Sequence, residues 1–554
     1  MNATEVRAIK AGVYPRLLLC HKSLPPQVLI IKTLFVRVLM LKKSLISGTL
    51  ILMGSAFIVR ILGFFYRIYL SNLIGAEGMG LFQLIFPVYS LIILTLTSGI
   101  SIAVSKMVAG ELARNHMTNL RRITNCALAL IISLGTVVSL FCFTYGEFLA
   151  NVVLKDPRTY FSIMLLIPCI PVIAAASALK GYFYGIQNTV PTAVSQIVEQ
   201  IVRIGLVMAT AGWFLRAGLE YACAIATFGM ALGEIANLTV LYLIYGFRKS
   251  RAEHRVAKSG LLRKRVIFRE LIIESLPISF NRFIISAMSA VENILIPARM
   301  LAGGLSHQQS LGAFGRLAGM AMPLLFFPSI VTSSLATTLV PAISEAMSLR
   351  NYRSVNHMIS KAIRLTFIMG LIVTAVFISY PNEIGNMIYR KQNIGPMLYI
   401  LSFTCIFIYL QQTLLGILNG LGKQGISLVN SVIGSVIRIG FVYFCIPSYG
   451  ISGYVYGIIT SSACVSILNL YAVYKTTGIV LDFRNWIFKP GLAGVVMVFS
   501  GKCIYRFFTV FNLGHILTTI LTVGAYVCLA VCLMKCLGVL EKGELAKLLG
   551  IKNR

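Results

Sequence analysis

Residues 179–205 read LKGYFYGIQNTVPTAVSQIVEQIVRIG, and residues 414–440 read LLGILNGLGKQGISLVNSVIGSVIRIG. The two segments align without a gap, so that Arg203 matches Arg438 at an offset of 235 positions. An internal repeat of this kind indicates a chain built from two related halves. If each half crosses a membrane an even number of times, both insert the same way up, with a substrate site expected between them.

The composition is that of an integral membrane protein. Of 554 residues, 57% are hydrophobic and only 12% are charged, with a mean hydropathy of +0.85. Soluble domains carry about 25% charged residues. The formal net charge of +32 would suggest nucleic acid in a soluble protein, but here the basic residues fall mostly in short loops between apolar runs. This pattern is typical of the positive-inside rule, so we expect no nucleic-acid partner.

Long apolar runs predict an all-α polytopic fold. A spanning helix needs about 20 mostly apolar residues, and fourteen runs meet this requirement. The first twelve form two six-helix repeats, and the last two are an addition at the C-terminus. The expected spans lie near residues 45–69, 81–104, 123–146, 160–180, 191–214, 220–246, 271–298, 316–341, 361–380, 396–419, 425–446, 451–474, 489–508 and 514–536.

The loop charges predict the orientation. Loops after even-numbered spans are basic, and the one after span six, residues 248–269, holds nine Lys or Arg and one Glu. The loop after span one holds only Glu77. Basic loops stay in the cytoplasm, so both termini are expected there.

The same features predict the domain organisation. Met40 is followed by LKKS and an apolar run, so it is either the natural start or the end of a basic tail. The expected parts are a tail 1–39, an N-lobe 40–247, a basic connector 248–270, a C-lobe 271–475, a final helix pair 476–540 and a cytoplasmic tail 541–554.

Charged residues inside the spans point to a substrate site. A charge near the bilayer centre is costly, and it usually faces a water-filled cavity or the interior of the bundle. Arginines outnumber acids at this depth, which suits an anionic cargo because guanidinium binds phosphate with a bidentate fork. The candidate site residues are Arg60, Arg203, Arg282, Arg438, Glu199 and Glu234.

Local spacing separates these candidates. Glu199 lies one helical turn before Arg203, so the two can pair, either as one wall of a cavity or as a neutralised structural pair. Gly434 occupies the corresponding position in the second half, so Arg438 is expected to lack a partner. Arg60 and Arg282 also have no acid one turn away on the same helix, which makes them the strongest candidates.

Three other charges are expected at the membrane surface. Arg67 follows Arg60 toward the outer end of span one and is predicted to snorkel to the interface. Glu292 and Arg299 fall near the outer end of span seven and are also predicted to be interfacial.

No pattern for a metal or cofactor is present. The sequence has no CxxC pair and no HExxH. The run NGLGKQG, residues 419–425, has Gln424 where a phosphate loop needs Ser or Thr. We therefore expect no metal, no cofactor and no catalytic residue.

Three motifs carry a family resemblance: RILGFFYR (60–67), NLIGAEGMGLFQLIFPVYSLI (72–92) and MAMPLLFFPSIVTSSLATTLVPAISEA (320–346). With them, residues 40–540 resemble the polysaccharide transporter branch of the multidrug/oligosaccharidyl-lipid/polysaccharide (MOP) exporter superfamily, and most of all its members in spore-forming bacteria. The resemblance implies a two-lobed bundle that alternates access in the bacterial cytoplasmic membrane.

The implied cargo is an undecaprenyl-diphosphate-linked oligosaccharide or peptidoglycan precursor, moved to the outer leaflet for spore cortex synthesis. Membrane lipids and cell-wall or polysaccharide synthesis enzymes are the other implied partners, and the last two spans would hold the lipid tail. In related lipid II flippases an R-x-L-G-F motif matches Arg60 to Phe64. Those flippases also carry an arginine in span two, which this chain lacks, so the cargo stays open.

Two alternatives remain. A cation-coupled multidrug efflux pump of the same superfamily would favour acidic cavity residues and twelve spans. A membrane-bound glycan polymerase or ligase would need a large external loop or a clustered His/Asp/Glu site, and the sequence shows neither. We therefore expect a transporter rather than an enzyme.

Overall fold

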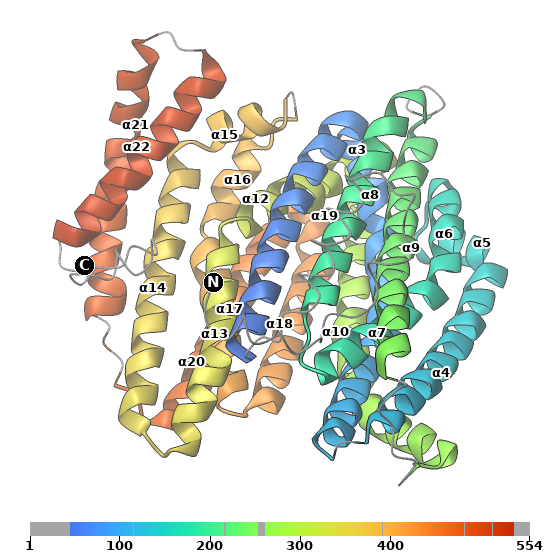
Figure 1. The fold of residues 1–554 in the computed structure, drawn as a ribbon. Coiled ribbons are helices and arrows are strands. Elements are labelled where there is room, and N and C mark those ends of the chain that lie inside the picture. Colours follow the sequence, from blue (N-terminus) through green and yellow to red (C-terminus); the bar gives the residue numbers. More distant parts are fainter. Residues whose placement is uncertain are drawn as a thin grey trace, which may run out of the picture.

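The computed structural model describes residues 45–536 except 115, 215–217, 253–260, 391, 481, 483 and 512–513. The expected N-terminal tail with Met40, the C-terminal tail and the middle of the connector lie outside these residues. Within the described part the chain is helical and has no strand, so the all-α polytopic fold is confirmed (Figure 1).

The helices follow one another with short connections. The first half contains α3 (Leu45–Ala113), α4 (Met117–Thr144), α5 (Gly146–Phe148), α6 (Tyr160–Leu166), α7 (Ile170–Gly185), α8 (Val190–Phe214) and α9 (Leu219–Ala252). The second half contains α10 (Lys264–Ala302), α11 (His307–Phe314), α12 (Met322–Phe326), α13 (Ser329–Ser348), α14 (Tyr352–Ser379), α15 (Pro381–Ile388), α16 (Gly395–Ser402), α17 (Cys405–Gly420), α18 (Gln424–Phe444), α19 (Ile446–Tyr449) and α20 (Ile451–Thr477), and α21 (Lys489–Thr509) and α22 (His515–Cys536) follow.

The number of spans depends on how bent helices are counted. The described residues contain twelve helices long and apolar enough to cross a membrane, or thirteen if α16 and α17, bent by 52°, form one span. Helix α3 counts once in this total, although it breaks at Gly75, where φ is +69°. This left-handed backbone conformation carries little penalty only for glycine. Each of the fourteen expected spans overlaps one of these helices, but the exact number stays a prediction.

The helices form two groups with α3 between them. In Figure 1, α4 to α9 lie on one side of the first arm of α3, and α13, α14, α17 and α20 are labelled on the other. Helices α21 and α22 lie outside the second group, where α21 packs against α14. The largest hydrophobic core includes residues of both groups, such as Leu70 of α3, Met230 of α9 and Tyr409 of α17.

Helix α10 packs on both groups. Near its start, Ile267 and Leu271 belong to a core cluster with residues of α3, α4 and α7. Near its end, Glu292 bonds to α18 and α20. The expected C-lobe begins at residue 271, inside α10, and so includes most of a helix that contacts both groups.

Between α10 and α13 the chain is a series of short helical pieces. Ser306 caps α11 in a capping box with Gln309, in which each side chain bonds the backbone of the other residue. A π-helical segment, η5 (Gly315–Ala321), then joins α11 to α12. Pro328 immediately precedes α13, where its missing N–H costs no helical hydrogen bond. These breaks direct the first turns of α13 toward the cavity described next.

Candidate functional site

A polar cavity of about 510 Å³ lies between the two groups of helices. Both arms of α3 line it, together with α8 and α9 from the first half and α12, α13 and α17 from the second. Ligand pockets usually have volumes of about 300–1,000 Å³, so a small headgroup can fit. The polar lining residues are Arg60, Tyr66, Arg67, Gln200, Arg203, Ser329, Ser333 and Gln412.

Two of the three cavity arginines have no acidic partner. Arg60 donates from Nη1 to the hydroxyl of Ser333 over 2.6 Å, and it makes no ion pair within the described residues. Arg67 forms neither an ion pair nor a side-chain hydrogen bond with the described part of the chain. Arg67 lines the cavity, so the expectation that it snorkels to the interface is wrong. Two uncompensated positive charges therefore face this space.

The third arginine is neutralised on its own helix. Nη2 of Arg203 lies 2.5 Å from Oε1 of Glu199, one turn earlier on α8. Asn237 of α9 donates from Nδ2 to Oε2 of Glu199 over 3.0 Å and to Oε2 of Glu234 over 3.3 Å. The expected pair of Glu199 and Arg203 is confirmed, and Glu234 belongs to the same cluster without lining the cavity.

Arg438 has a partner from another helix. Its Nε lies 2.9 Å and 3.0 Å from the two carboxylate oxygens of Glu292 on α10, and its Nη2 donates to Ser435. Tyr454 of α20 donates to the same carboxylate over 2.7 Å. The expectation that Arg438 lacks a partner is therefore wrong. The expectation that Glu292 is interfacial is also wrong, because Glu292 is buried. Arg438 does not line the cavity.

Arg282 is also absent from the cavity lining. It lies exposed on α10 and makes no ion pair with the described residues. Arg299, also on α10, lies over the ring of Tyr443 with its Cζ 4.2 Å from the ring centroid. Of the four arginines predicted near the midplane, the structure therefore brings Arg60 and Arg203 together in one space.

A second charged cluster joins the two halves at one end of the bundle. Arg158 contacts Glu77 of α3 over 2.7 Å and Asp156 over 2.9 Å. From the second half, His307 bonds Asp156 over 2.8 Å and Gln308 bonds Glu77 over 2.9 Å. Burial alone would raise the pKa of Asp156, but the hydrogen bonds from Arg158 and His307 hold it below its usual value.

Glycines close the same end tightly. A Cβ on Gly315 of η5 would lie only 1.9 Å from the carbonyl oxygen of Ala76, and one on Gly80 would lie 2.2 Å from that of Leu311. Helix α3 and the α11–η5 segment therefore touch backbone to backbone. Together with the charged cluster, this contact holds α3 against the second half at that end of the bundle.

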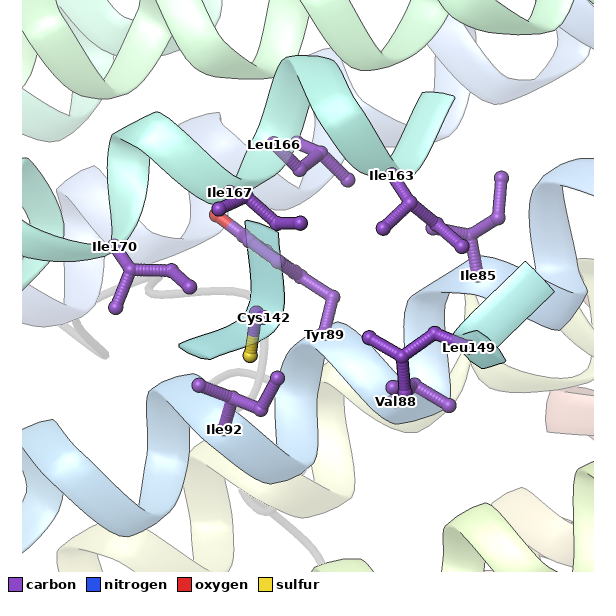
Figure 2. A pocket seen from close by; sticks show the side chains of 10 residues that line it. All are labelled: Ile85, Val88, Tyr89, Ile92, Cys142, Leu149, Ile163, Leu166, Ile167 and Ile170. Carbon is purple, nitrogen blue, oxygen red and sulfur yellow. The ribbon is translucent and has the colours of Figure 1, made fainter. Parts of the chain in front are cut away.

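A much smaller cavity lies inside the first half. It has a volume of about 30 Å³, and its lining is apolar except for the hydroxyl of Tyr89 (Figure 2). That volume could hold a water, but a buried water needs two to four polar partners. This space is a packing void, which leaves the polar cavity as the candidate substrate site. The residues drawn around the void are Ile85, Val88, Tyr89, Ile92, Cys142, Leu149, Ile163, Leu166, Ile167 and Ile170.

Sequence reasoning missed several cavity residues, and one of them had a usable signal. Arg67 is seven positions after Arg60, which is close to two helical turns, so the two share a face of α3. Gly63, on the same face, also lines the cavity. The uncharged residues, such as Gln200 and Gln412, had no such signal, because a single amide in an apolar run is not distinctive.

A polytopic helical bundle around a polar cavity is the architecture of a membrane transporter. Comparison with known families gives the class. A model described as "Polysaccharide biosynthesis protein" matches residues 45–347, and one described as "Lipid II flippase MurJ" matches residues 319–525. The chain belongs to the polysaccharide biosynthesis protein family, a transporter branch of the MOP superfamily, as the motifs predicted. Its relatives are transporters and flippases rather than enzymes.

Curated relatives from Bacillus subtilis (strain 168) support this assignment. Stage V sporulation protein B is 30% identical over 83% of this chain and 89% of its own length. Lipid II flippase MurJ is 27% identical over 72% of this chain and 77% of its own length. Both matches span most of each protein, so the similarity extends beyond a single lobe.

Solved structures show the same fold. The lipid II flippase MurJ in an inward closed conformation superimposes with a TM-score of 0.65, at 14% identity, over 88% of this chain and 99% of that one. An inward-facing multidrug resistance MATE family transporter of the MOP superfamily gives 0.61, at 16% identity, over 79% and 99%. At these identities the likeness concerns the fold alone.

Proposed function

We propose that this protein is a flippase for an anionic, undecaprenyl-diphosphate-linked oligosaccharide or peptidoglycan precursor. The observation that carries the proposal is the pair of uncompensated arginines, Arg60 and Arg67, in a cavity between the two halves. A guanidinium binds phosphate oxygens through two parallel hydrogen bonds and stays charged when water is excluded. A cavity with two such groups is suited to a diphosphate.

The charge of the cavity supports the same cargo. Glu199 neutralises Arg203, so Arg60 and Arg67 supply two net positive charges. A diphosphate diester carries two negative charges near neutral pH. Binding would compensate both partners in a space of low dielectric constant, where an uncompensated charge is costly.

The relatives support the direction and the setting of transport. Two of them are named for sporulation or for flipping lipid II. These names favour a cell-wall precursor as the cargo and spore cortex synthesis as the process that uses it. The basic loops favour an orientation with both termini in the cytoplasm. Cargo would then enter from the cytoplasmic side and leave toward the outer leaflet, with its lipid tail along α21 and α22.

Alternating access requires a contact that opens and closes. In this orientation the cluster of Glu77, Asp156, Arg158 and His307 lies at the outer end, because its members come from loops after odd-numbered spans. Its ion pairs and the glycine contact of η5 with α3 would separate when the protein opens outward. We propose this cluster as the outer gate.

Reconstitution tests the proposal. Wild-type protein in proteoliposomes should move a fluorescent undecaprenyl diphosphate carrying one N-acetylhexose between leaflets. Arg60→Ala and Arg67→Ala should each slow this movement by about tenfold or more, since charge-assisted hydrogen bonds contribute about 1.5–3 kcal/mol. Arg353→Ala, an exposed arginine at the start of α14, is the control and should leave the rate unchanged.

Two outcomes would contradict the proposal. Wild-type protein that moves no lipid-linked diphosphate is not a flippase of this class. Equal rates for wild type, Arg60→Ala and Arg67→Ala would mean that these arginines do not bind the cargo. Arg282 is a predicted intramembrane arginine outside the cavity lining, so comparing the rate of Arg282→Ala with that of Arg60→Ala shows whether the effect requires an arginine in the cavity.

One observation favours a second candidate, a cation-coupled multidrug efflux pump. Glu199 and Glu234 lie together on either side of Asn237 inside the bundle, as coupling acids would. The test is uptake of a cationic dye under a sodium or proton gradient in the same proteoliposomes. Dye transport that is lost in Glu234→Gln, with no movement of lipid-linked diphosphate, would favour the pump.

A further inference from the structure

The two walls of the polar cavity differ in charge. All three arginines come from first-half helices, Arg60 and Arg67 from α3 and Arg203 from α8. The second half contributes no charged residue to the lining. Its polar groups are two hydroxyls of α13 and one amide of α17, from Ser329, Ser333 and Gln412.

The amide of Gln412 is held in a fixed orientation. Thr332, buried behind the wall, shares its hydroxyl proton between the carbonyl oxygen of Ser329, 2.9 Å away, and Oε1 of Gln412, 3.1 Å away. Nε2 of Gln412 points to the hydroxyl of Ser329 over 3.4 Å. A primary amide has two N–H donors and two acceptor lone pairs on its oxygen. One donor and one lone pair of Gln412 are therefore free for a ligand in the cavity.

The facing wall also holds polar atoms that have no protein partner in the described residues. Gln200 is only 9% exposed, and its Oε1 is buried without a hydrogen-bond partner in the described residues. The hydroxyl oxygen of Tyr66 is also buried without a hydrogen-bond partner in the described residues. Phosphate oxygens accept hydrogen bonds, so an ionised diphosphate cannot satisfy the acceptor oxygen of Gln200.

The walls meet where Arg60 donates to Ser333 across the boundary between the halves. A ligand with its phosphates at Arg60 thus has its next atoms beside Ser333, Ser329 and Gln412. We propose that these three residues form a sugar-reading subsite, which binds hydroxyl or acetamido groups of the cargo, while the arginine wall binds its diphosphate. This inference rests on the proposed flippase function and assigns selectivity for the sugar to the second half.

Sugar chemistry fits this subsite. The hydroxyls of Ser329 and Ser333 already donate to backbone carbonyls of the preceding turn, so each offers a lone pair that can accept from a sugar hydroxyl. The amide of Gln412 adds a donor and an acceptor, whereas guanidinium groups only donate. A site built to hydrogen-bond a ligand rejects an analogue lacking that group, because its own buried polar atoms are left unpaired. The cargo without its sugar should therefore move more slowly, even though its diphosphate is intact.

Two probes with a label at the end of the lipid tail test this assignment: undecaprenyl diphosphate carrying one N-acetylglucosamine, and undecaprenyl diphosphate carrying a methyl ester in place of the sugar, which keeps the same two negative charges. Flipping of both is measured on one preparation of proteoliposomes, so the amount of folded protein cancels in the ratio of the two rates. Wild type should favour the sugar probe by about tenfold or more, and Gln412→Met should abolish this preference.

Matched variants locate the effect. Ser329→Ala should lower the preference in the same direction, whereas Arg60→Ala should slow both probes by a similar factor. Thr337→Val removes a hydroxyl from the same helix, two turns beyond Ser329 and outside the cavity lining, and should keep the preference.

Two results would overturn the subsite. One is a wild type that moves both probes equally, and the other is a Gln412→Met variant that keeps the wild-type preference, whether or not it slows both probes. Wild type that moves neither probe overturns the flippase proposal itself, so the two failures are distinguishable.

Discussion

Arg203 and Arg438 occupy equivalent positions in the two halves, yet their carboxylate partners come from different places. Arg203 pairs with Glu199 one turn earlier on its own helix, and its side chain lines the cavity. Arg438 pairs with Glu292, 146 positions earlier on α10, and a buried tyrosine, Tyr454, binds the same carboxylate. The two aligned sequence segments share the arginine, but its acidic partner comes from different places.

This difference separates an ion pair within one helix from an ion pair that ties helices together. A partner on the same helix makes Arg203 electrically self-contained, so α8 can shift against its neighbours without leaving a charge unpaired. The partner on α10 ties α18 and α20 to that helix through a cluster with little access to solvent. The first half therefore supplies the charge of the cavity, and the second half uses its arginine to fix helices together.

The largest expected effect comes from breaking the second-half pair. Arg438→Ala leaves Glu292 buried without its cation and should lower the free energy of unfolding by about 3–5 kcal/mol. Thermal unfolding in detergent measures this loss. The double variant Arg438→Met with Glu292→Leu removes both charges and should recover much of the stability, because a well-packed apolar pair can replace a buried ion pair.

Transport of the same variants separates the two roles of arginine. Arg438→Ala protein that is as stable as wild type but inactive in flipping would place Arg438 with the cargo and would contradict the comparison. Arg203→Ala is the matched variant in the first half, and its effect should fall mainly on transport.

A smaller loss of stability should follow from placing a side chain where the second half has glycine. A Cβ on Gly434 would lie 2.4 Å from Cγ2 of Val465 on α20. Gly434→Ala should destabilise the protein by about 1–3 kcal/mol through overpacking, and Val465→Ala should relieve this loss in the double variant. An unaltered Tm in Gly434→Ala would show that close packing is not the reason for glycine here.

The fold was largely readable from the sequence because its cause is local. A run of about 20 apolar residues must form a helix in a bilayer, whatever it packs against. The break of α3 at Gly75 and the series of short helices around η5 depend instead on contacts with distant segments. Hydropathy carries no information on those contacts, so it predicts where the spans lie but not where they bend.

The site shows the same limit. Arg60 was found from its depth and from a motif, and the pair of Glu199 and Arg203 was found because one helical turn separates them. Glu292 was misplaced because the rule of pairing one turn apart cannot reveal a partner on another helix. The prediction for Arg67 is wrong because distance from the end of a helix does not account for the helix face that Arg67 shares with Arg60.

A third prediction compares the two carboxylates directly. Glu199→Gln removes the charge that neutralises Arg203, so binding of bare undecaprenyl diphosphate in detergent should strengthen by about three- to tenfold. Glu292→Gln should leave this affinity unchanged and lower thermal stability instead. Equal affinities for both variants and wild type would mean that Arg203 does not contribute to the potential of the cavity.

The smallest expected effect concerns Asp156, at the closed end and outside the membrane-spanning helices. Hydrogen bonds from Arg158 and His307 hold its folded-state pKa below the unfolded value of 3.8, so its contribution to stability is present above that pH. The contribution is lost as the pH falls through the folded-state pKa. The Tm of wild type should therefore drop more steeply below about pH 4 than that of Asp156→Asn, which cannot titrate at this position. Glu77 titrates in both proteins, so part of the slope should remain in the variant. Parallel curves would show that the carboxylate of Asp156 does not stabilise the closed end, and that the contact between the halves depends there on the glycine packing of η5 against α3.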